Sequence, residues 1–184
     1  MQAQIENLCQ LARDGSVEAA SELLKLHYER IFAFLRRLCG SEPDACDLTQ
    51  KTFCKAWAGL ASYGGRASFS TWLHGIAHHV YADWRRKGDR LCPQTDEWWL
   101  TCPAADANPF EDLAERDLAM QLYKSVDQLE EQIRETVHLH YYQGLTLQET
   151  ADAMGVAGST VKYRLRGAMD SLRQQLIEKK QALL

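Results

Sequence analysis

The stretch LTLQETADAMGVAGSTVKYRLRGAMDSLR, residues 145–173, predicts two helices that cross at a tight turn. Ala151 places a small side chain where the two helices touch, and Gly155 supplies the positive φ that such a turn requires. Val161 then provides an apolar side chain that seats the second helix against the first. This pattern is typical of a helix-turn-helix.

The two helices of this motif differ in their start signals and in their charge. Thr146 and Glu149 have the spacing of a reciprocal capping box, so we expect the first helix to begin there and to end near residue 154. The second helix begins at about Gly158, and residues 158–173 hold four Lys or Arg against one acid. A recognition helix reaches base edges and phosphates from its N-terminal half. The candidate DNA contacts are Ser159, Thr160, Lys162, Tyr163, Arg164 and Arg166. The alternative is an ordinary helical hairpin with a solvated basic face.

Upstream of this motif, apolar residues repeat at helical spacing in three segments. The first segment starts at Leu23 and ends at Gly40, a residue that favours the end of a helix. Ser41 is the expected N-cap of the second, whose apolar stripe runs to Leu60. A glycine-containing loop over residues 62–68 precedes the third, which we expect to run from Phe69 to Arg86 or the next residue. No segment alternates with a period of two, so the sequence predicts an all-α fold.

The chain divides into two small helical domains joined by a flexible acidic linker. Residues 92–110 contain three of the four prolines and show no periodicity. Residues 92–135 carry eleven acids and three bases, a segment that repels a phosphate backbone. We therefore expect domains over residues 1–90 and 112–184 with a linker over residues 91–111. Helical patterns continue over residues 113–123 and 126–142.

The composition of the 184 residues is that of an ordinary globular protein with a net charge of −4. Two local segments nevertheless are basic, because residues 61–91 hold five Lys or Arg against two acids, and residues 158–173 repeat the bias. Two basic patches with an acidic spacer suggest two contacts on one polyanion. The chain has no long apolar run and no signal-like N-terminus, so we expect a cytoplasmic protein without membrane insertion, with six free thiols.

Three blocks of sequence resemble the extracytoplasmic-function sigma factors of bacterial RNA polymerase. They are DACDLTQKTFCKAW (residues 44–57), FSTWLHGIAHHVYADWRRK (residues 69–87) and the helix-turn-helix stretch. The resemblance covers nearly the whole chain, in the family's order and spacing. It implies a non-enzymatic factor, without cofactor or metal, that binds core RNA polymerase and promoter DNA. It also implies an anti-sigma factor as a further partner, often one anchored in a membrane.

The resemblance assigns roles to two sets of residues in the N-terminal domain. Asp47, Gln50 and Lys51 share a polar helix face opposite a buried apolar stripe. The resemblance implies that this face binds the clamp helices of the polymerase. The alternative is a face that is only solvated. The second set contains residue types that stack on bases or bind phosphate, and the resemblance implies that it captures the single-stranded minus-ten element. This set is Tyr63, Arg66, His78, His79, Arg85 and Arg86. His79 stands where many relatives have asparagine.

Two other functions are compatible with parts of the sequence. A stand-alone helix-turn-helix repressor or activator would use the N-terminal helices for dimerisation or effector binding, but that hypothesis leaves the basic, aromatic third segment unexplained. A metal or thiol sensor would use the six histidines and six cysteines. His138 and His140 point in different directions on a helix, and the chain has no C-x-x-C or H-E-x-x-H pattern, so the spacing disfavours a metal site.

Overall fold

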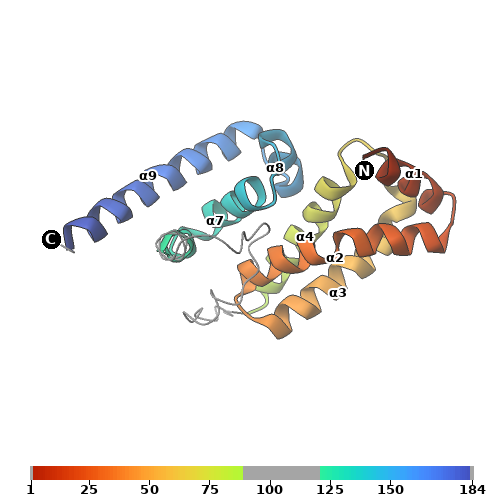
Figure 1. The fold of residues 1–184 in the computed structure, drawn as a ribbon, viewed down its shortest axis with the longest axis horizontal. Helices are drawn as coiled ribbons and strands as arrows, with labels where there is room; N and C mark the ends of the chain where they lie inside the picture. The colour runs from red at the N-terminus through yellow and green to blue at the C-terminus, as the bar shows by residue number, and fades with distance from the viewer. Residues whose placement is uncertain (1, 89–120, 183–184) are drawn as a thin grey trace, which may run out of the picture. The chain divides into compact units, whose positions relative to one another are not determined.

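A computed structural model of the chain describes residues 2–88 and 121–182. Every regular element in these two ranges is helical, which confirms the all-α prediction. The chain forms two compact units, and helices α1 to α4 belong to the first (Figure 1). The predicted linker and the helical pattern over residues 113–120 lie outside the described residues.

The first unit begins with a helix that the sequence analysis did not predict, α1 (Gln2–Arg13). Helix α2 (Val17–Cys39) follows after Ser16, whose side chain accepts a hydrogen bond from the backbone N–H of Ala19 at 3.1 Å. Helix α2 therefore begins six residues before the predicted start at Leu23. Its end is as predicted, because Gly40 adopts a φ of 71° and donates to the carbonyl of Arg36 at 3.0 Å.

Helices α3 (Glu42–Gly59) and α4 (Phe69–Arg86) are both capped at their N-termini by serine. Ser41 accepts from the N–H of Asp44 at 3.4 Å, which confirms the predicted cap. Ser68 accepts from the N–H of Thr71 at 3.1 Å. A single 3-10 turn, η1 (Leu60–Ser62), and a short loop connect the two helices.

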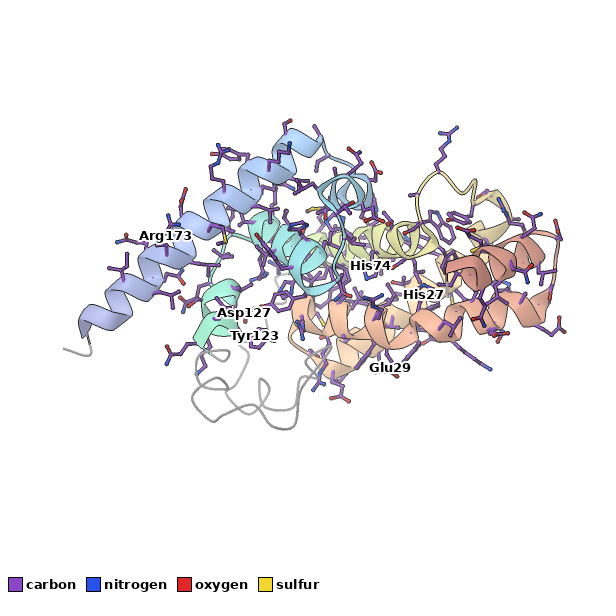
Figure 2. All side chains as sticks on the ribbon, turned by 45° about the horizontal axis from the view of Figure 1, so that its top comes forward. His27, Glu29, His74, Tyr123, Asp127 and Arg173 are labelled. Atoms are coloured by element: carbon purple, nitrogen blue, oxygen red, sulfur yellow. The ribbon has the colours of Figure 1, made fainter. Side chains whose placement is uncertain are left out.

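The core of the first unit combines aliphatic, aromatic and imidazole side chains. Its fully buried apolar residues include Leu23, Ile31, Phe34, Leu35, Leu48, Leu73 and Tyr81. His27 of α2 and His74 of α4 are also buried, and both are labelled in Figure 2. The His27 ring packs edge-on against Phe69 at 5.1 Å and the His74 ring against Phe34 at 5.6 Å. Burial lowers the pKa of His27, so this residue is neutral in the folded protein at pH 7.

The second unit contains a helical stretch over residues 121–127, then α7 (Glu131–Val137) and the π-helical turn η2 (His138–Tyr142). The helical pattern predicted over residues 126–142 is interrupted, because the chain turns at residues 128–130 and is helical on either side of the turn. Arg134 Nη1 donates to the backbone carbonyl of Asp127 at 3.0 Å and satisfies an acceptor that the break leaves without a helical partner.

Helices α8 (Leu147–Met154) and α9 (Gly158–Ala182) form the predicted helix-turn-helix. The backbone N–H of Thr146 donates to Glu149 Oε2 at 2.9 Å, and the N–H of Glu149 donates to Thr146 Oγ1 at 3.2 Å, which confirms the capping box. Gly155 adopts a φ of 66° in the turn. The core of this unit is one cluster that includes Val126, Leu129, Val137, Ala151, Val161, Leu165, Ala168 and Leu172.

Candidate nucleic-acid and protein interfaces

One face of α3 is polar and exposed, as its sequence predicts. Asp47, Gln50 and Lys51 are all exposed, while Leu48 and Thr52 are buried on the opposite side. Lys51 Nζ lies 2.5 Å from Asp47 Oδ2. Because both side chains are more than half exposed, this ion pair contributes only about 0.3–0.5 kcal/mol to stability. Its charged groups therefore remain accessible to a partner at little cost to the fold.

Beside this face lies an apolar groove of about 970 Å³ between α2 and α3, which we call the α2/α3 groove. Tyr28 of α2 stacks on Phe53 of α3 with ring centroids 5.7 Å apart. Tyr28 and Trp57 are 43% and 45% exposed. The lining residues are Ser21, Leu24, Lys25, Tyr28, Glu29, Cys46, Gln50, Phe53, Cys54 and Trp57. Sequence reasoning missed the aromatic members, because spacing alone cannot tell an exposed apolar face from a core face.

The loop between η1 and α4 presents Arg66 to solvent. Gly65 beside it adopts a φ of 69°, a conformation that glycine allows without strain. Tyr63, which the sequence grouped with Arg66 as a DNA contact, is instead only 9% exposed. Its ring packs against Phe69 and Trp72, so the structure does not present it as a surface for base stacking.

Helix α4 carries the remaining residues predicted to contact the minus-ten element. His79 is exposed, and its Nδ1 lies 2.6 Å from the carbonyl of Gly75. A carbonyl can only accept, so Nδ1 carries the hydrogen and Nε2 is the accepting atom of the neutral ring. His78, half-buried, packs its ring edge-on against His79 at 5.7 Å. Arg85 is half-buried and Arg86 is exposed.

An acidic residue moderates the positive charge of this helix. Asp83 accepts a hydrogen bond from Arg86, and this bond holds the pKa of the Asp83 carboxyl below its usual value. Lys55 of α3 lies 3.8 Å from the same carboxylate. Lys55 thus adds its charge to the cationic surface of α4. The sequence could not predict this role, because Lys55 and Asp83 belong to different helices.

The N-terminal half of α9 separates its six candidate contacts into two groups. Ser159, Lys162, Tyr163 and Arg166 are exposed and recur at helical spacing, so they share one face. Tyr163 is 76% exposed, so its ring and hydroxyl are accessible from solvent on this face.

The other two candidates flank that face. Thr160 and Arg164 are half-buried, and Arg164 Nη2 donates to Gln132 Oε1 of α7. Arg164 therefore joins α9 to α7 and supports the orientation of the recognition helix.

Three further features of the described residues bear on metal binding, membrane insertion and thiol chemistry. Within residues 2–88 and 121–182, no three His, Cys, Asp or Glu side chains are grouped so that they could hold a metal ion. In the same part of the chain, no helix combines the length and apolarity needed to cross a membrane. Cys9 and Cys39 are buried free thiols, and Cys46 and Cys54 are exposed ones. The other two cysteines lie outside the described residues.

An all-helical chain with a cationic helix and loop in one unit and an exposed recognition helix in the other defines a two-domain DNA-binding protein. Comparison with known families agrees, because residues 23–91 match sigma-70 region 2 and residues 126–174 match sigma-70 region 4. The chain belongs to the extracytoplasmic-function group of the sigma-70 family. It is therefore a non-enzymatic factor that binds core RNA polymerase and directs initiation of transcription at specific promoters.

Individual relatives agree with this family. The chain is 31% identical over 156 residues to the extracytoplasmic-function sigma factor SigE of Mycolicibacterium smegmatis, covering 84% of this chain and 60% of that protein. It is 28% identical over 166 residues to the sigma factor YlaC of Bacillus subtilis, covering 89% of this chain and 95% of that protein. The fold resembles that of the sigma factor RpoE from Bartonella quintana, solved with the anti-sigma factor NepR, with a TM-score of 0.67, 24% identity, and coverage of 87% and 98%.

Proposed function

We propose that the exposed face of α3 and the adjoining α2/α3 groove form the surface that binds core RNA polymerase. Asp47, Gln50 and Lys51 supply the polar contacts, and the apolar groove supplies the area that a stable protein interface buries. The exposure of Tyr28 and Trp57 supports this assignment, because large exposed aromatic side chains gathered in one groove are typical of protein interfaces.

The cationic surface of the first unit is proposed to bind the single-stranded minus-ten element. Arg66, Arg85 and Arg86 provide phosphate contacts, and His78 and His79 provide planar rings and hydrogen-bonding edges for bases. A base held outside the duplex needs such an edge to be recognised. Because His79 Nδ1 is engaged with the Gly75 carbonyl, the accepting Nε2 is the atom proposed to meet a donor on the base.

The exposed face of α9 is proposed to bind the duplex minus-thirty-five element. Lys162, Tyr163 and Arg166 reach toward bases and phosphates, and Ser159 lies in the first helical turn, where a hydroxyl and backbone N–H groups suit a phosphate. Thr160 and Arg164 contribute at the flank. The single observation that carries the whole proposal is that each of the two compact units presents its own exposed cationic helix face.

The proposed domain organisation has the first domain over residues 1–90 and the second over residues 112–184, with the linker passing through the polymerase. An anti-sigma factor is proposed to hold the protein inactive in the cytoplasm. The structural similarity to a sigma factor that was solved with its anti-sigma factor supports this part of the proposal. Such a partner should compete with core polymerase for the α2/α3 groove.

Run-off transcription with purified core polymerase tests the proposal. The wild-type chain should program initiation, and the double variant Asp47→Ala, Gln50→Ala should bind core polymerase more weakly while its helicity is unchanged. Glu22→Ala is the matched control, because Glu22 is exposed on α2 but does not line the groove. Unchanged capture of core polymerase by the double variant would refute the assignment of this face. A chain that binds duplex DNA alone but never supports initiation would instead be a repressor or activator.

A further inference from the structure

The loop that presents Arg66 is closed by a hydrogen bond between its two ends. The hydroxyl of Tyr63 donates to the backbone carbonyl of Ala67 at 2.6 Å. Between them lie two glycines and Arg66, and such a segment loses much conformational entropy when it is ordered. The Tyr63 hydroxyl therefore restricts the loop to one shape before any DNA is bound.

The ring of Tyr63 is fixed from the side of α4. It packs edge-on against Phe69 with centroids 5.7 Å apart and lies tilted over Trp72 at 5.0 Å. Burial raises the pKa of the Tyr63 phenol, so its O–H remains a donor at neutral pH. An anchored ring and a protonated hydroxyl together make Tyr63 a fixed point for the loop.

The backbone of Tyr63 is held from the other side by α1. Arg13 Nη1 donates to the Tyr63 carbonyl at 3.3 Å, and Arg13 Nη2 donates to Gln10 Oε1 at 2.7 Å. Leu8, Cys9 and Ala12 are the buried apolar residues of α1 and pack it into the first unit. Because α1 is packed into the core, the hydrogen bond from Arg13 holds the backbone of Tyr63, at the start of the loop, in a fixed place.

We propose that Tyr63 and Arg13 are positioning residues that hold the loop in the shape that receives the minus-ten strand, with α1 as its support. The inference rests on the proposed role of Arg66 and this loop in binding single-stranded DNA. It changes the role of Tyr63 from a stacking contact to a structural determinant of the loop. It also gives α1 a function in promoter recognition, although α1 carries no DNA-binding residue of its own in the proposal.

Tyr63→Phe separates the two roles of this residue. Phenylalanine keeps the ring, so a stacking role would survive the change, but it removes the hydrogen bond to Ala67. Loss of one such bond should weaken binding of the minus-ten strand about 5-fold. Arg13→Gln should act in the same direction, because it removes the bond to the Tyr63 carbonyl.

The assay uses holoenzyme assembled from core polymerase and the full chain. A promoter is first selected from a randomised duplex library by wild-type holoenzyme in transcription rounds. Binding is then measured by fluorescence anisotropy with the labelled non-template minus-ten oligonucleotide and, separately, with the minus-thirty-five duplex. Tyr63→Phe should weaken only the first interaction, and its affinity for core polymerase should equal that of the wild type.

Tyr81→Phe is the matched control, because the Tyr81 hydroxyl also donates to a backbone carbonyl, that of Leu38 at 3.3 Å, in the core of the same unit. An equal defect in Tyr81→Phe would mean that general destabilisation weakens binding, and it would overturn the inference. Wild-type binding by Tyr63→Phe together with weak binding by Arg66→Ala would also overturn it while leaving the proposed function intact. Wild-type binding by Arg66→Ala would instead refute the proposed role of the loop itself.

Discussion

Two glycines of the helix-turn-helix should respond to alanine substitution in opposite directions. Gly155 has a φ of 66°, and a Cβ added there meets no heavy atom within 4 Å, so its substitution is opposed by backbone strain alone. That strain costs an L-residue about 1–2 kcal/mol. Gly158, at the start of α9, does not have a positive φ, and its added Cβ would lie 3.9 Å from Gln148 Oε1. Alanine there should stabilise the unit by about 0.4–1 kcal/mol by restricting the unfolded chain.

Amide hydrogen exchange in the full chain is the suitable assay, because it reports on each unit separately. All five tryptophans precede residue 100, so tryptophan fluorescence does not report on the second unit. Val161 and Leu165 belong to the core of the second unit. Their amide protection should fall about 5- to 30-fold in Gly155→Ala and rise slightly in Gly158→Ala.

Protection in the first unit is the internal control, and the amides of Leu48 and Leu73 should exchange as in the wild type in both variants. Unchanged protection of Val161 in Gly155→Ala would refute the argument from backbone strain. A loss in Gly158→Ala as large as that in Gly155→Ala would show that crowding at the turn, and not the sign of φ, controls the stability of the motif.

Three further predictions concern the second unit. Burial raises the pKa of Asp127 from 3.8 to about 6, so the folded state binds the carboxyl proton of Asp127 more tightly than the unfolded chain does. The stability that this proton contributes is fully present below pH 3.8 and is lost as the pH rises through 6. Because the Asp127 carboxyl is partly exposed, the expected gain is discounted, and Asp127→Asn should stabilise this unit by about 1 kcal/mol at pH 7. The substitution should also flatten the pH dependence of the melting temperature, measured by circular dichroism. Equal melting curves of the variant and the wild type at pH 7 would contradict this prediction. Thr146→Ala removes one half of the capping box and should cost about 1 kcal/mol in the same assay, whereas a neutral effect would show that Glu149 alone suffices. Arg166→Ala should weaken binding of the minus-thirty-five duplex by about 1–3 kcal/mol in anisotropy titrations. The control Arg173→Ala, exposed but about two turns further along α9, should have a smaller effect, and the opposite order would move the contact toward the C-terminal part of the helix.

The features that the sequence predicted correctly depend on residues close together in the chain. The cap at Ser41, the end of α2 at Gly40 and the capping box at Thr146 each involve atoms within four residues of one another. A hydrogen bond over so short a separation is determined by residue type and spacing alone. The same holds for the helix-turn-helix, whose turn requires only the glycine at position 155 and apolar residues at fixed offsets.

The tertiary structure decided which aromatic and basic side chains are accessible. Tyr63 and Tyr163 both lie within three residues of an arginine, yet the first is buried and the second is exposed. The backbone contact that fixes Tyr63 comes from Arg13, fifty residues earlier, in α1 (Gln2–Arg13), a helix that was not among the predicted ones. The sequence by itself therefore determined most of the helices, the ends that are set by local caps, and the family. Only the packing of distant helices determined which of the predicted DNA contacts face solvent, because burial depends on neighbours that local spacing does not specify.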